Sequence, residues 1–324
     1  MIEKLIDICK TKKNIYIQTH DYPDPDAVSS AFALKTLLEL NSVEAKIVYV
    51  GKIDRISTER MVSLFRIDIQ SFDGNYNDGD NIILVDSQNK AGNVTINGGN
   101  VFASVDHHPT GVPCEYEYQQ LNLIGACASV LTNEYIETNT EMPEDVATAL
   151  LYGLKMDTLN FTRGTTETDI SCFSYLLCHS DKENLRFLET SNLILSDLKA
   201  FGLAIENIKV IADIGISFVP FDCPDGLISA LSDFMLSIDE ISISIVFSQR
   251  EYGIKLSVRS ILPYVDAGVL TKNALSGIGS GGGHPSFAGG FIPKGNLESI
   301  EDDKKIQFLC NKFMNSYKEI MWND

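Results

Sequence analysis

Blocks of apolar and polar residues alternate along the first half of the chain. Short apolar runs predict buried strands at residues 14–18, 45–50, 81–85 and 100–105, and helical patterns occupy residues 27–40, 126–137 and 144–155. Strands that alternate with helices favour a parallel sheet with right-handed crossovers. In such sheets ligands bind beyond the carboxyl ends of the strands. The polar residues that follow these strands are therefore the first candidates for chemistry.

The second half has a different pattern. Residues 181–209 are polar with a helical pattern, which indicates a connector, whereas residues 241–247 and 252–258 alternate and predict a hairpin around 248–251. A chain of 324 residues is long enough for two domains. We therefore predict an α/β protein with an N-terminal, mostly parallel sheet flanked by helices and a smaller mixed α/β C-terminal domain. The predicted boundaries are 1–185, a helical linker at 186–209, and 210–324.

Composition narrows the class of partner. Hydrophobic residues make up 44% and charged residues 22% of the chain, as in soluble globular proteins. The formal net charge of −18 disfavours a grip on long nucleic acid, but a small anion bound beside metal ions is compatible with an acidic protein. The seven cysteines form no C-x-x-C pair, and the chain shows no signal-peptide pattern and no membrane-spanning apolar run. We expect reduced, mostly buried thiols and a cytoplasmic protein without a membrane partner.

Asp and His residues follow the predicted strands. The first strand is followed by His20, Asp24 and Asp26, the strand at 81–85 by Asp86, the strand at 100–105 by Asp106, His107 and His108, and the helix at 144–155 by Asp157. Taken singly, Asp24 and Asp26 could be turn or helix-capping residues, with Asp26 placed to cap the next helix. Adjacent histidines behind an aspartate are harder to explain by packing.

The combination predicts a metal site. Carboxylates gathered at one edge of a sheet repel one another unless cations neutralise them. Carboxylate and imidazole ligands suit Mn²⁺ or a similar ion, and without a nearby cysteine a structural zinc site is disfavoured. Two such ions roughly 3.5–4 Å apart can share a carboxylate and activate water for in-line attack on phosphorus. The sequence therefore predicts a two-metal hydrolase.

The same residues resemble, in order, the four motifs of the DHH phosphoesterase family. The resemblance implies that His20, Asp24 and Asp86 hold one metal, and that Asp26, Asp86, His107 and Asp157 hold the other. It also implies two catalytic residues that are not metal ligands. Asp106 would orient a histidine ligand, and His108 would contact the phosphate and assist the leaving oxygen. The implied cofactors are two divalent ions, Mn²⁺ first, with Mg²⁺ or Co²⁺ as alternatives.

The C-terminal half carries a second resemblance. Ser280-Gly281-Gly282-Gly283-His284 is similar to the glycine-rich motif of the DHH-associated C-terminal domain. Gly282 and Gly283 would approach phosphate through a nest of backbone N–H groups, with His284 as a further donor. The segment Ser257, Arg259 and Ser260 resembles one that holds a substrate phosphate in small family members, although Arg259 could also be an ordinary surface arginine. Tyr264 and Phe287 are candidates to stack on a base, with a place in the core as the alternative.

Two residues depart from the family pattern. Pro25 stands where glycine is common, and Met156 stands where threonine is frequent. Proline fixes φ near −65°, so the first motif must accept that conformation. Neither change removes a predicted ligand, and both bear on substrate preference.

The resemblance to small two-domain members, which include nanoRNase/pAp phosphatases, implies the substrate class. We expect hydrolysis of short oligonucleotides or dinucleotides such as pApA to mononucleotides, with 3′-phosphate removal from pAp as a second activity. Long duplex DNA is not an expected partner, and a homodimer is left open. The alternatives are a RecJ-like single-strand exonuclease, disfavoured by length and charge, and a non-catalytic nucleotide-binding regulator, disfavoured by the full ligand set. A family pyrophosphatase ranks lower, because the C-terminal domain of that group lacks the glycine–histidine motif.

Overall fold

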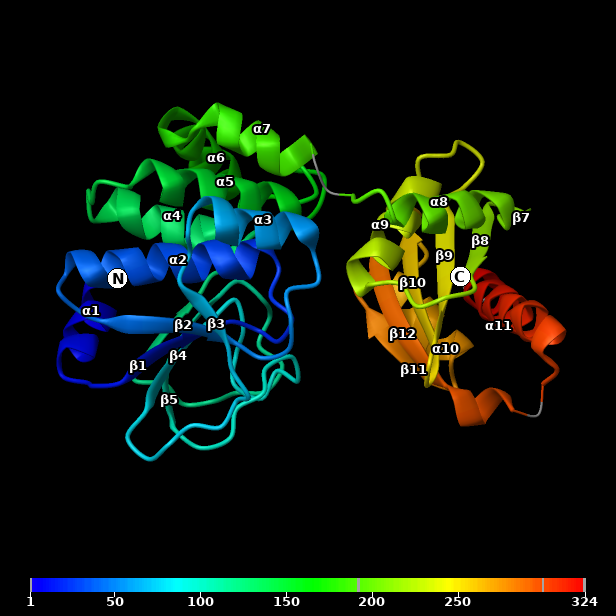
Figure 1. Ribbon diagram of the computed structural model, residues 1–324, viewed down its shortest axis with the longest axis horizontal. Helices are drawn as coiled ribbons and strands as arrows, with labels where there is room; N and C mark the ends of the chain where they lie inside the picture. The colour runs from blue at the N-terminus through cyan, green and yellow to red at the C-terminus, as the bar shows by residue number, and fades with distance from the viewer. Residues whose placement is uncertain (1, 191–192, 299, 323–324) are drawn as a thin grey trace. The chain divides into compact units, whose positions relative to one another are not determined.

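The chain divides into two compact units. The computed structural model describes residues 2–190, 193–298 and 300–322, and the units are Met1–Asn192 and Leu193–Asp324 (Figure 1). The division falls inside the polar stretch 181–209, because helix α7 (Lys182–Thr190) belongs to unit 1 and helix α8 (Asp197–Glu206) to unit 2. The domain boundaries at 185 and 209 stay predictions.

Unit 1 is built on a six-stranded sheet in which every neighbouring pair is parallel. Its strands are β1 (Ile15–Gln18), β2 (Ala45–Tyr49), β3 (Ile69–Ser71), β4 (Asn81–Val85), β5 (Asn100–Asp106) and β6 (Tyr118–Leu121), in the order β3-β2-β1-β4-β5-β6. The four strands predicted from apolar runs are β1, β2, β4 and β5, so the expected parallel sheet is confirmed. The short strands β3 and β6 at the two edges carry no comparable apolar run.

Helices are layered on the sheet of unit 1 (Figure 1). They are α1 (Ile2–Lys10), α2 (Pro25–Leu40), α3 (Ile56–Leu64), α4 (Cys127–Glu137), α5 (Glu144–Asp157), α6 (Glu167–His179) and α7. Helix α2 is buried on nearly all sides, because it packs against the strands and against α4 and α5. A helix with this environment must be apolar all round, which explains its Ala- and Leu-rich sequence. The opposite face of the sheet is covered by a small cluster around Val48, Tyr76 and Leu84.

The strand order places a topological switch point between β1 and β4. From β1 the chain proceeds outward to β2 and β3, then returns to the other side of β1 and proceeds through β4, β5 and β6. At such a point the loops after two neighbouring strands separate and leave a crevice at their carboxyl ends. His20 follows β1 and Asp86 follows β4 directly, so both predicted ligands lie at this crevice.

Unit 2 contains a second six-stranded sheet, which is mixed. Its order is β11-β12-β10-β9-β8-β7, with β8 and β9 parallel and the other pairs antiparallel. Its strands are β7 (Lys209–Ile211), β8 (Ile214–Val219), β9 (Ile243–Arg250), β10 (Gly253–Ser260), β11 (Ser280–Gly283) and β12 (Phe287–Pro293). Its helices are α8, α9 (Asp225–Met235), α10 (Ala267–Ala274), the 3-10 turn η1 (Lys294–Leu297) and α11 (Asp302–Trp322). The predicted mixed domain and its hairpin are confirmed, with strands longer than expected and only residues 251–252 between them.

The glycine run differs from the prediction. Residues Ser280–Gly283 form β11, the edge strand that pairs with β12, and none of these glycines has a positive φ. A nest requires alternating left- and right-handed backbone, so the run is not a nest in this structure. A side chain at Gly283 would come within 2.3 Å of the Phe287 carbonyl oxygen, and one at Gly281 within 2.7 Å of Thr271. Glycine at these positions lets the strand lie tightly against its neighbours.

The predictions about membrane-spanning segments and about the cysteines can be compared with the structure. Among the described helices, none is both long and apolar enough to cross a bilayer. Cys9, Cys127, Cys172, Cys223 and Cys310 are buried free thiols, as expected, whereas Cys178 is exposed and Cys114 half-buried.

Candidate metal centre

The first motif begins helix α2. The Asp24 carboxylate accepts hydrogen bonds from the backbone N–H groups of Asp26 and Ala27 at 3.0 and 3.1 Å, so Asp24, not Asp26, is the N-cap. Pro25 is the first residue of the helix, where its fixed φ is favourable and its missing N–H costs nothing. The proline that replaces the family's glycine is therefore accommodated by the helix itself.

Asp26 caps a different helix. Its two carboxylate oxygens accept hydrogen bonds from the N–H groups of Cys127 and Ala128 at 2.7 and 2.8 Å, in the first turn of α4. The side chain of the α4 N-cap residue, Ala126, makes no capping hydrogen bond. Asp26 is 1% exposed and thus joins α2 to the N-terminus of α4, where the helix dipole favours negative charge. The alternative reading of Asp26, as the cap of the helix that follows it, is therefore not what the structure shows.

Asp86 lies between two histidines. One of its oxygens is 3.6 Å from His20 Nε2, and the other is 3.3 Å from His107 Nε2. The residue is 3% exposed and has φ of 57°, a left-handed conformation that aspartate tolerates better than most residues. This turn at the end of β4 presents one carboxylate oxygen to each histidine.

The two adjacent histidines have different partners. The Nδ1 atom of His107 lies 3.0 Å from the carbonyl oxygen of Ile124, so it donates there and leaves Nε2 for the carboxylates. The Nδ1 atom of His108 lies 2.9 Å from an oxygen of Asp106. Asp106 also accepts from the backbone N–H of His107 and from Gln88 Nε2, at 2.8 and 2.7 Å. The Asp106 carboxylate therefore orients the ring of His108. We expected it to orient a histidine that binds metal, which is His107, but it contacts only the backbone N–H of His107.

Asp157 is the last residue of helix α5 and lies close to the other predicted metal ligands. One of its oxygens is 3.5 Å from His107 Nε2, and the other accepts from Arg163 Nη2 at 3.0 Å. Three consecutive residues after it, Leu159, Asn160 and Phe161, have φ of 48°, 54° and 68°. A left-handed turn of non-glycine residues is strained, and strain of this kind clusters at functional sites.

This turn gives a stability prediction. Replacing Leu159, which is 43% exposed, with glycine should raise the free energy of unfolding by on the order of 1 kcal/mol, because glycine adopts positive φ without a steric penalty. Chemical denaturation measures the change. Ile170→Gly is the matched control, because Ile170 is 49% exposed but helical, and there glycine should destabilise by roughly 0.5–1 kcal/mol. Equal destabilisation by both substitutions would contradict strain at Leu159.

The predicted ligands form three overlapping groups. Within each group the candidate ligand atoms all lie within 4.8 Å of one another. The groups are His20, Asp24 and Asp86; Asp26, His107 and Asp157; and Asp86, His107 and His108. Asp86 belongs to two of them. All six predicted metal ligands are thus brought together in unit 1, together with both predicted catalytic residues, Asp106 and His108.

The protonation of these groups reflects crowded negative charge. Burial by itself would lower the pKa of His20 and His107, but the carboxylates beside them, Asp24 and Asp86 for His20 and chiefly Asp86 for His107, raise it to about 10 and about 11. Burial and the charge of neighbouring aspartates raise the pKa of Asp26 well above its usual value and that of Asp157 to about 6. Without cations, the group can reduce its repulsion only by binding protons.

The residues present fit divalent cations. Among the described residues, the buried atoms Asp86 Oδ1 and His107 Nε2 have no hydrogen-bond partner. Buried polar atoms are rarely left unpaired, and these two face each other across 3.3 Å within a cluster of carboxylates. Oxygen and imidazole nitrogen are the donors that Mn²⁺ and similar ions accept. His20, Asp24 and Asp86 would hold one ion, and Asp26, Asp86, His107 and Asp157 a second.

The predicted phosphate-binding residues lie in unit 2. Arg259, on β10, donates from Nε to Asp233 at 2.7 Å and from Nη1 to Ser257 Oγ at 2.9 Å. Ser257 and Ser260 are 5% and 4% exposed. Ser257 supports the arginine, and the Ser260 hydroxyl accepts from the backbone N–H of Leu262. Of this segment, the guanidinium of Arg259 is the group best placed to meet a ligand.

His284 and Phe287 lie beside this arginine. The His284 and Phe287 ring centroids are 4.7 Å apart, and the Arg259 guanidinium carbon is 5.9 Å from the Phe287 ring. Gly282 and Gly283 pair with Gly289 and Ala288 in β11 and β12, next to these side chains. Tyr264, the other stacking candidate, is 52% exposed. A cation, an imidazole and an aromatic ring are thus gathered at one end of the second sheet.

Three contributors escaped sequence reasoning. Gln88 holds Asp106, Arg163 holds Asp157, and Tyr22, which is 56% exposed, lies between His20 and Asp24 in the chain. Tyr22 has φ of 56°, and its ring covers Gly51 so closely that a side chain there would come within 2.9 Å. The closeness of Gln88 and Arg163 to Asp86 and Asp157 in sequence was the available signal.

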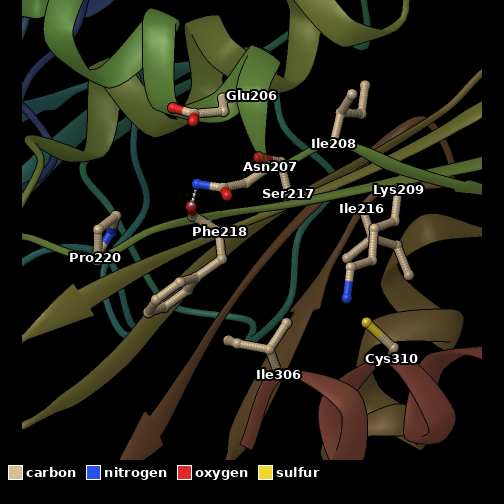
Figure 2. Close-up of a pocket in the computed structure, with 10 residues that line it drawn as sticks. All are labelled: Glu206, Asn207, Ile208, Lys209, Ile216, Ser217, Phe218, Pro220, Ile306 and Cys310. Atoms are coloured by element: carbon tan, nitrogen blue, oxygen red, sulfur yellow. Dashed lines mark hydrogen bonds between the residues drawn. The ribbon is translucent and has the colours of Figure 1, made fainter. Parts of the chain in front are cut away.

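Unit 2 also contains a cavity of about 490 Å³ (Figure 2). It is lined by the end of α8, by β7 and β8, and by Ile306 and Cys310 of α11. Asn207 points across it toward the carbonyl oxygen of Phe218, at 3.5 Å. None of the sequence-predicted site residues lines this cavity, so it is separate from the candidate phosphate-binding cluster.

Two known protein families match this chain, one in each unit. The pattern of the DHH family, N-terminal domain, matches residues 14–154, and that of the DHHA1 domain matches residues 209–309. Uncharacterised protein MJ1633 of Methanocaldococcus jannaschii is 29% identical over 303 residues, which cover 93% of this chain and 62% of that protein. A probable manganese-dependent inorganic pyrophosphatase of Archaeoglobus fulgidus is 30% identical over 167 residues, 47% of this chain and 51% of the relative. The chain thus spans less than two thirds of the length of either relative.

A solved structure extends the similarity to the whole fold. The crystal structure of an exopolyphosphatase-related protein from Bacteroides fragilis superposes with a TM-score of 0.78 and 17% sequence identity, covering 99% of this chain and 97% of the other. At that identity the likeness concerns the fold alone.

Proposed function

We propose that this chain, which belongs to the DHH family and combines its N-terminal domain with a DHHA1 domain, is a two-metal phosphoesterase that hydrolyses short oligonucleotides or dinucleotides to mononucleotides. Removal of the 3′-phosphate from pAp is a proposed second activity. The observation that carries the proposal is the shared carboxylate of Asp86, which presents one oxygen to His20 and the other to His107. A carboxylate that faces two groups of candidate ligands is suited to hold two adjacent cations.

The chemistry divides between the ions and the protein. Two divalent cations bound there would supply positive charge for the phosphate, polarise its oxygens and lower the pKa of water. The protein's own part is to fix the donors. His20 donates from Nδ1 to the Asp21 carbonyl oxygen at 2.8 Å, and His107 donates from Nδ1 to that of Ile124 at 3.0 Å. In both rings this hydrogen bond directs Nε2 into the carboxylate cluster.

His108 is placed for proton transfer. Asp106 engages its Nδ1, and the side chain is 41% exposed, in contrast to 9% for His107. The Nε2 atom of His108 can therefore hold a proton and donate it to a phosphate oxygen or to the leaving oxygen. Gln88, through its bond to Asp106, holds this pair in place.

Each unit, taken by itself, offers groups that suit a nucleotide. In unit 2, Arg259 and His284 offer donors for a phosphate, and Phe287 offers a ring face. In unit 1, the exposed ring of Tyr22 belongs to the same loop as His20 and Asp24, and could stack on a base. An aromatic surface beside phosphate-binding groups suits a nucleotide better than an inorganic phosphate.

Inorganic pyrophosphate is the second candidate substrate. Similarity to the probable pyrophosphatase of A. fulgidus favours it, but that similarity covers only 47% of this chain. The DHHA1 match at residues 209–309 and the glycine–histidine segment inside it favour the nucleotide. A non-catalytic regulator would have no need of the complete ligand set.

The test is a comparison of substrates at equal concentration with Mn²⁺. The panel contains a 5′-phosphorylated RNA dinucleotide, pAp, cyclic di-AMP, a 24-mer and inorganic pyrophosphate. We expect the dinucleotide to be consumed at least tenfold faster than the 24-mer and pyrophosphate. Faster loss of pyrophosphate would replace the proposal with the second candidate, and faster loss of the 24-mer would favour an exonuclease. No turnover of any substrate would favour a nucleotide-binding regulator.

A further inference from the structure

The segment of residues 124–128, which leads into helix α4, contacts two members of one group of candidate metal ligands. The carbonyl oxygen of Ile124 accepts the Nδ1 proton of His107 at 3.0 Å. The N–H groups of Cys127 and Ala128 bind the carboxylate of Asp26 at 2.7 and 2.8 Å.

The residue that follows the third member, Asp157, packs against the same segment. A side chain at Gly125 would come within 2.8 Å of Thr158, the residue that follows Asp157 and caps α5. Gly125 therefore permits a close approach that any larger residue would prevent. This one segment therefore binds Asp26 and His107 directly and packs against the residue next to Asp157. Asp26, His107 and Asp157 together form one group of candidate ligands.

One side chain holds this segment from outside the group. Asp169, in the first turn of α6, accepts the Gly125 N–H on Oδ2 at 2.8 Å, and a side chain at Gly125 would meet that same oxygen at 2.7 Å. Asp169 is 0% exposed, and Oδ2 also accepts from the N–H and hydroxyl of Thr166 at 2.8 and 2.7 Å.

The geometry exceeds what a helix cap requires. A capping box requires only the reciprocal hydrogen bonds between the N-cap residue and the residue three positions later. Here the carboxylate is fully buried, its Oδ1 has no hydrogen-bond partner among the described residues, and it reaches a backbone group 44 positions away. A buried, half-satisfied carboxylate costs stability, so an apolar residue would serve packing better.

We propose that Asp169 is a positioning residue for the metal centre: by fixing Gly125 it sets the Ile124 carbonyl oxygen that orients His107, and the α4 N-terminus that orients Asp26. The inference rests on the metal-binding role of these residues in the proposed function. It assigns to Asp169 no contact with metal or substrate. Outer partners of metal ligands typically change metal affinity 10–100-fold when they are replaced.

The experiment compares Asp169→Asn with Thr166→Val in the full-length protein. The amide is isosteric but a weaker acceptor and neutral, so we expect the Kd for Mn²⁺, measured by calorimetry, to rise about tenfold or more. Thr166→Val removes a capping partner of the same carboxylate but keeps the Gly125 bond. It should lower the Tm while the Kd for Mn²⁺ changes less than twofold. Gly125→Ala is a second route to the displaced segment and should raise the Kd in the same direction.

A spectroscopic readout separates positioning from loss of stability. In the Mn²⁺-free, Zn²⁺-loaded protein, imidazole ¹⁵N spectra should show His107 with its proton on Nδ1, and Asp169→Asn should broaden or shift that signal while His179 stays unchanged. The inference is overturned if Asp169→Asn lowers the Tm as Thr166→Val does but leaves the Kd and the His107 signal as in the parent. Parent protein that binds Mn²⁺ yet hydrolyses no substrate would refute the proposed function and leave this inference standing.

Discussion

Replacing Asp86 with alanine should reduce Mn²⁺-dependent hydrolysis by about 10³-fold or more, the equivalent of roughly 4 kcal/mol of transition-state stabilisation. The reason is geometric, because the two oxygens of Asp86 face His20 and His107 at 3.6 and 3.3 Å. Removing the carboxylate takes one donor from each of two groups and the negative charge that both ions would share. Steady-state kinetics with the dinucleotide measure the loss, and calorimetry should show fewer Mn²⁺ ions bound than the two expected for the parent.

The control lies at the other end of the same strand. Asp80 directly precedes β4, is 5% exposed and accepts a hydrogen bond from the Asn77 N–H at 2.9 Å. Asp80→Asn changes a buried carboxylate away from the carboxyl edge, and activity should stay within about twofold of the parent. If Asp86→Ala retained a tenth of the parent's activity, Asp86 would not be the shared ligand. Equal losses at both positions would indicate a folding effect.

The metal-free protein should lose thermal stability as the pH rises from 6.5 to 9, and Mn²⁺ should reverse the trend. In the folded state the pKa of His20 is raised to about 10 and that of His107 to about 11, against 6.5 in the unfolded chain. The folded state thus holds protons that the unfolded chain releases above pH 6.5. Their contribution is complete below pH 6.5 and disappears as the pH approaches the folded-state pKa, by up to about 1.4 kcal/mol per pH unit for each histidine.

The aspartates do not oppose this trend in that window. The pKa of Asp157 is raised to about 6, so its contribution has the same sign but falls mainly between pH 4 and 6. The pKa of Asp24 and that of Asp106 are lowered by their histidine partners, so their contribution is already complete above pH 4. The pKa of Asp26 is raised well above its usual value, so its contribution has the same sign as that of the histidines. Between pH 6.5 and 9 none of these carboxylates therefore opposes the histidine terms.

Metal binding displaces these protons, so Mn²⁺ should bind more tightly as the pH rises. Thermal melts of the full-length protein between pH 6.5 and 9, with a chelator and with Mn²⁺, measure how the Tm depends on pH in the two states. His107→Gln should flatten the slope seen with the chelator, whereas His179→Gln, at the end of α6 and outside the cluster, should leave it unchanged. A metal-free Tm that stays level or rises over this range would show that the histidines are not held protonated by the carboxylates.

Much of the N-terminal fold was predictable because buried parallel strands are continuous apolar runs. Strands β1, β2, β4 and β5 are mostly apolar and mostly buried, and they were found from the sequence. The edge strands β3 and β6 are short and partly polar, so their pairing depends on a neighbour and not on their own residues. The glycine strand β11 was missed for a related reason, because glycine carries no side-chain pattern and forms a strand only where β12 provides partners.

The candidate site was also predicted only in part from the sequence. The residue types and their order after successive strands came from the sequence, because parallel strands bring their carboxyl ends to one edge. The sequence did not show which helix each aspartate caps. Asp24 caps α2, whereas Asp26 caps α4, whose first turn lies about a hundred residues further along the chain. The partner of Asp106 was likewise misassigned, since the choice between the His107 and His108 rings depends on side-chain direction after the strand.

The sequence by itself therefore determined the alternation of strands and helices, the two-part organisation, and the set of carboxylates and imidazoles at one edge of the first sheet. These features follow from local hydrophobic pattern and from the direction of parallel strands. Only the tertiary structure decided the contacts of Asp86 with two histidines, the helix that Asp26 caps, and the link from Asp169 to Gly125. Each of these joins residues far apart in the chain, and local pattern carries no information about such pairs until packing fixes them.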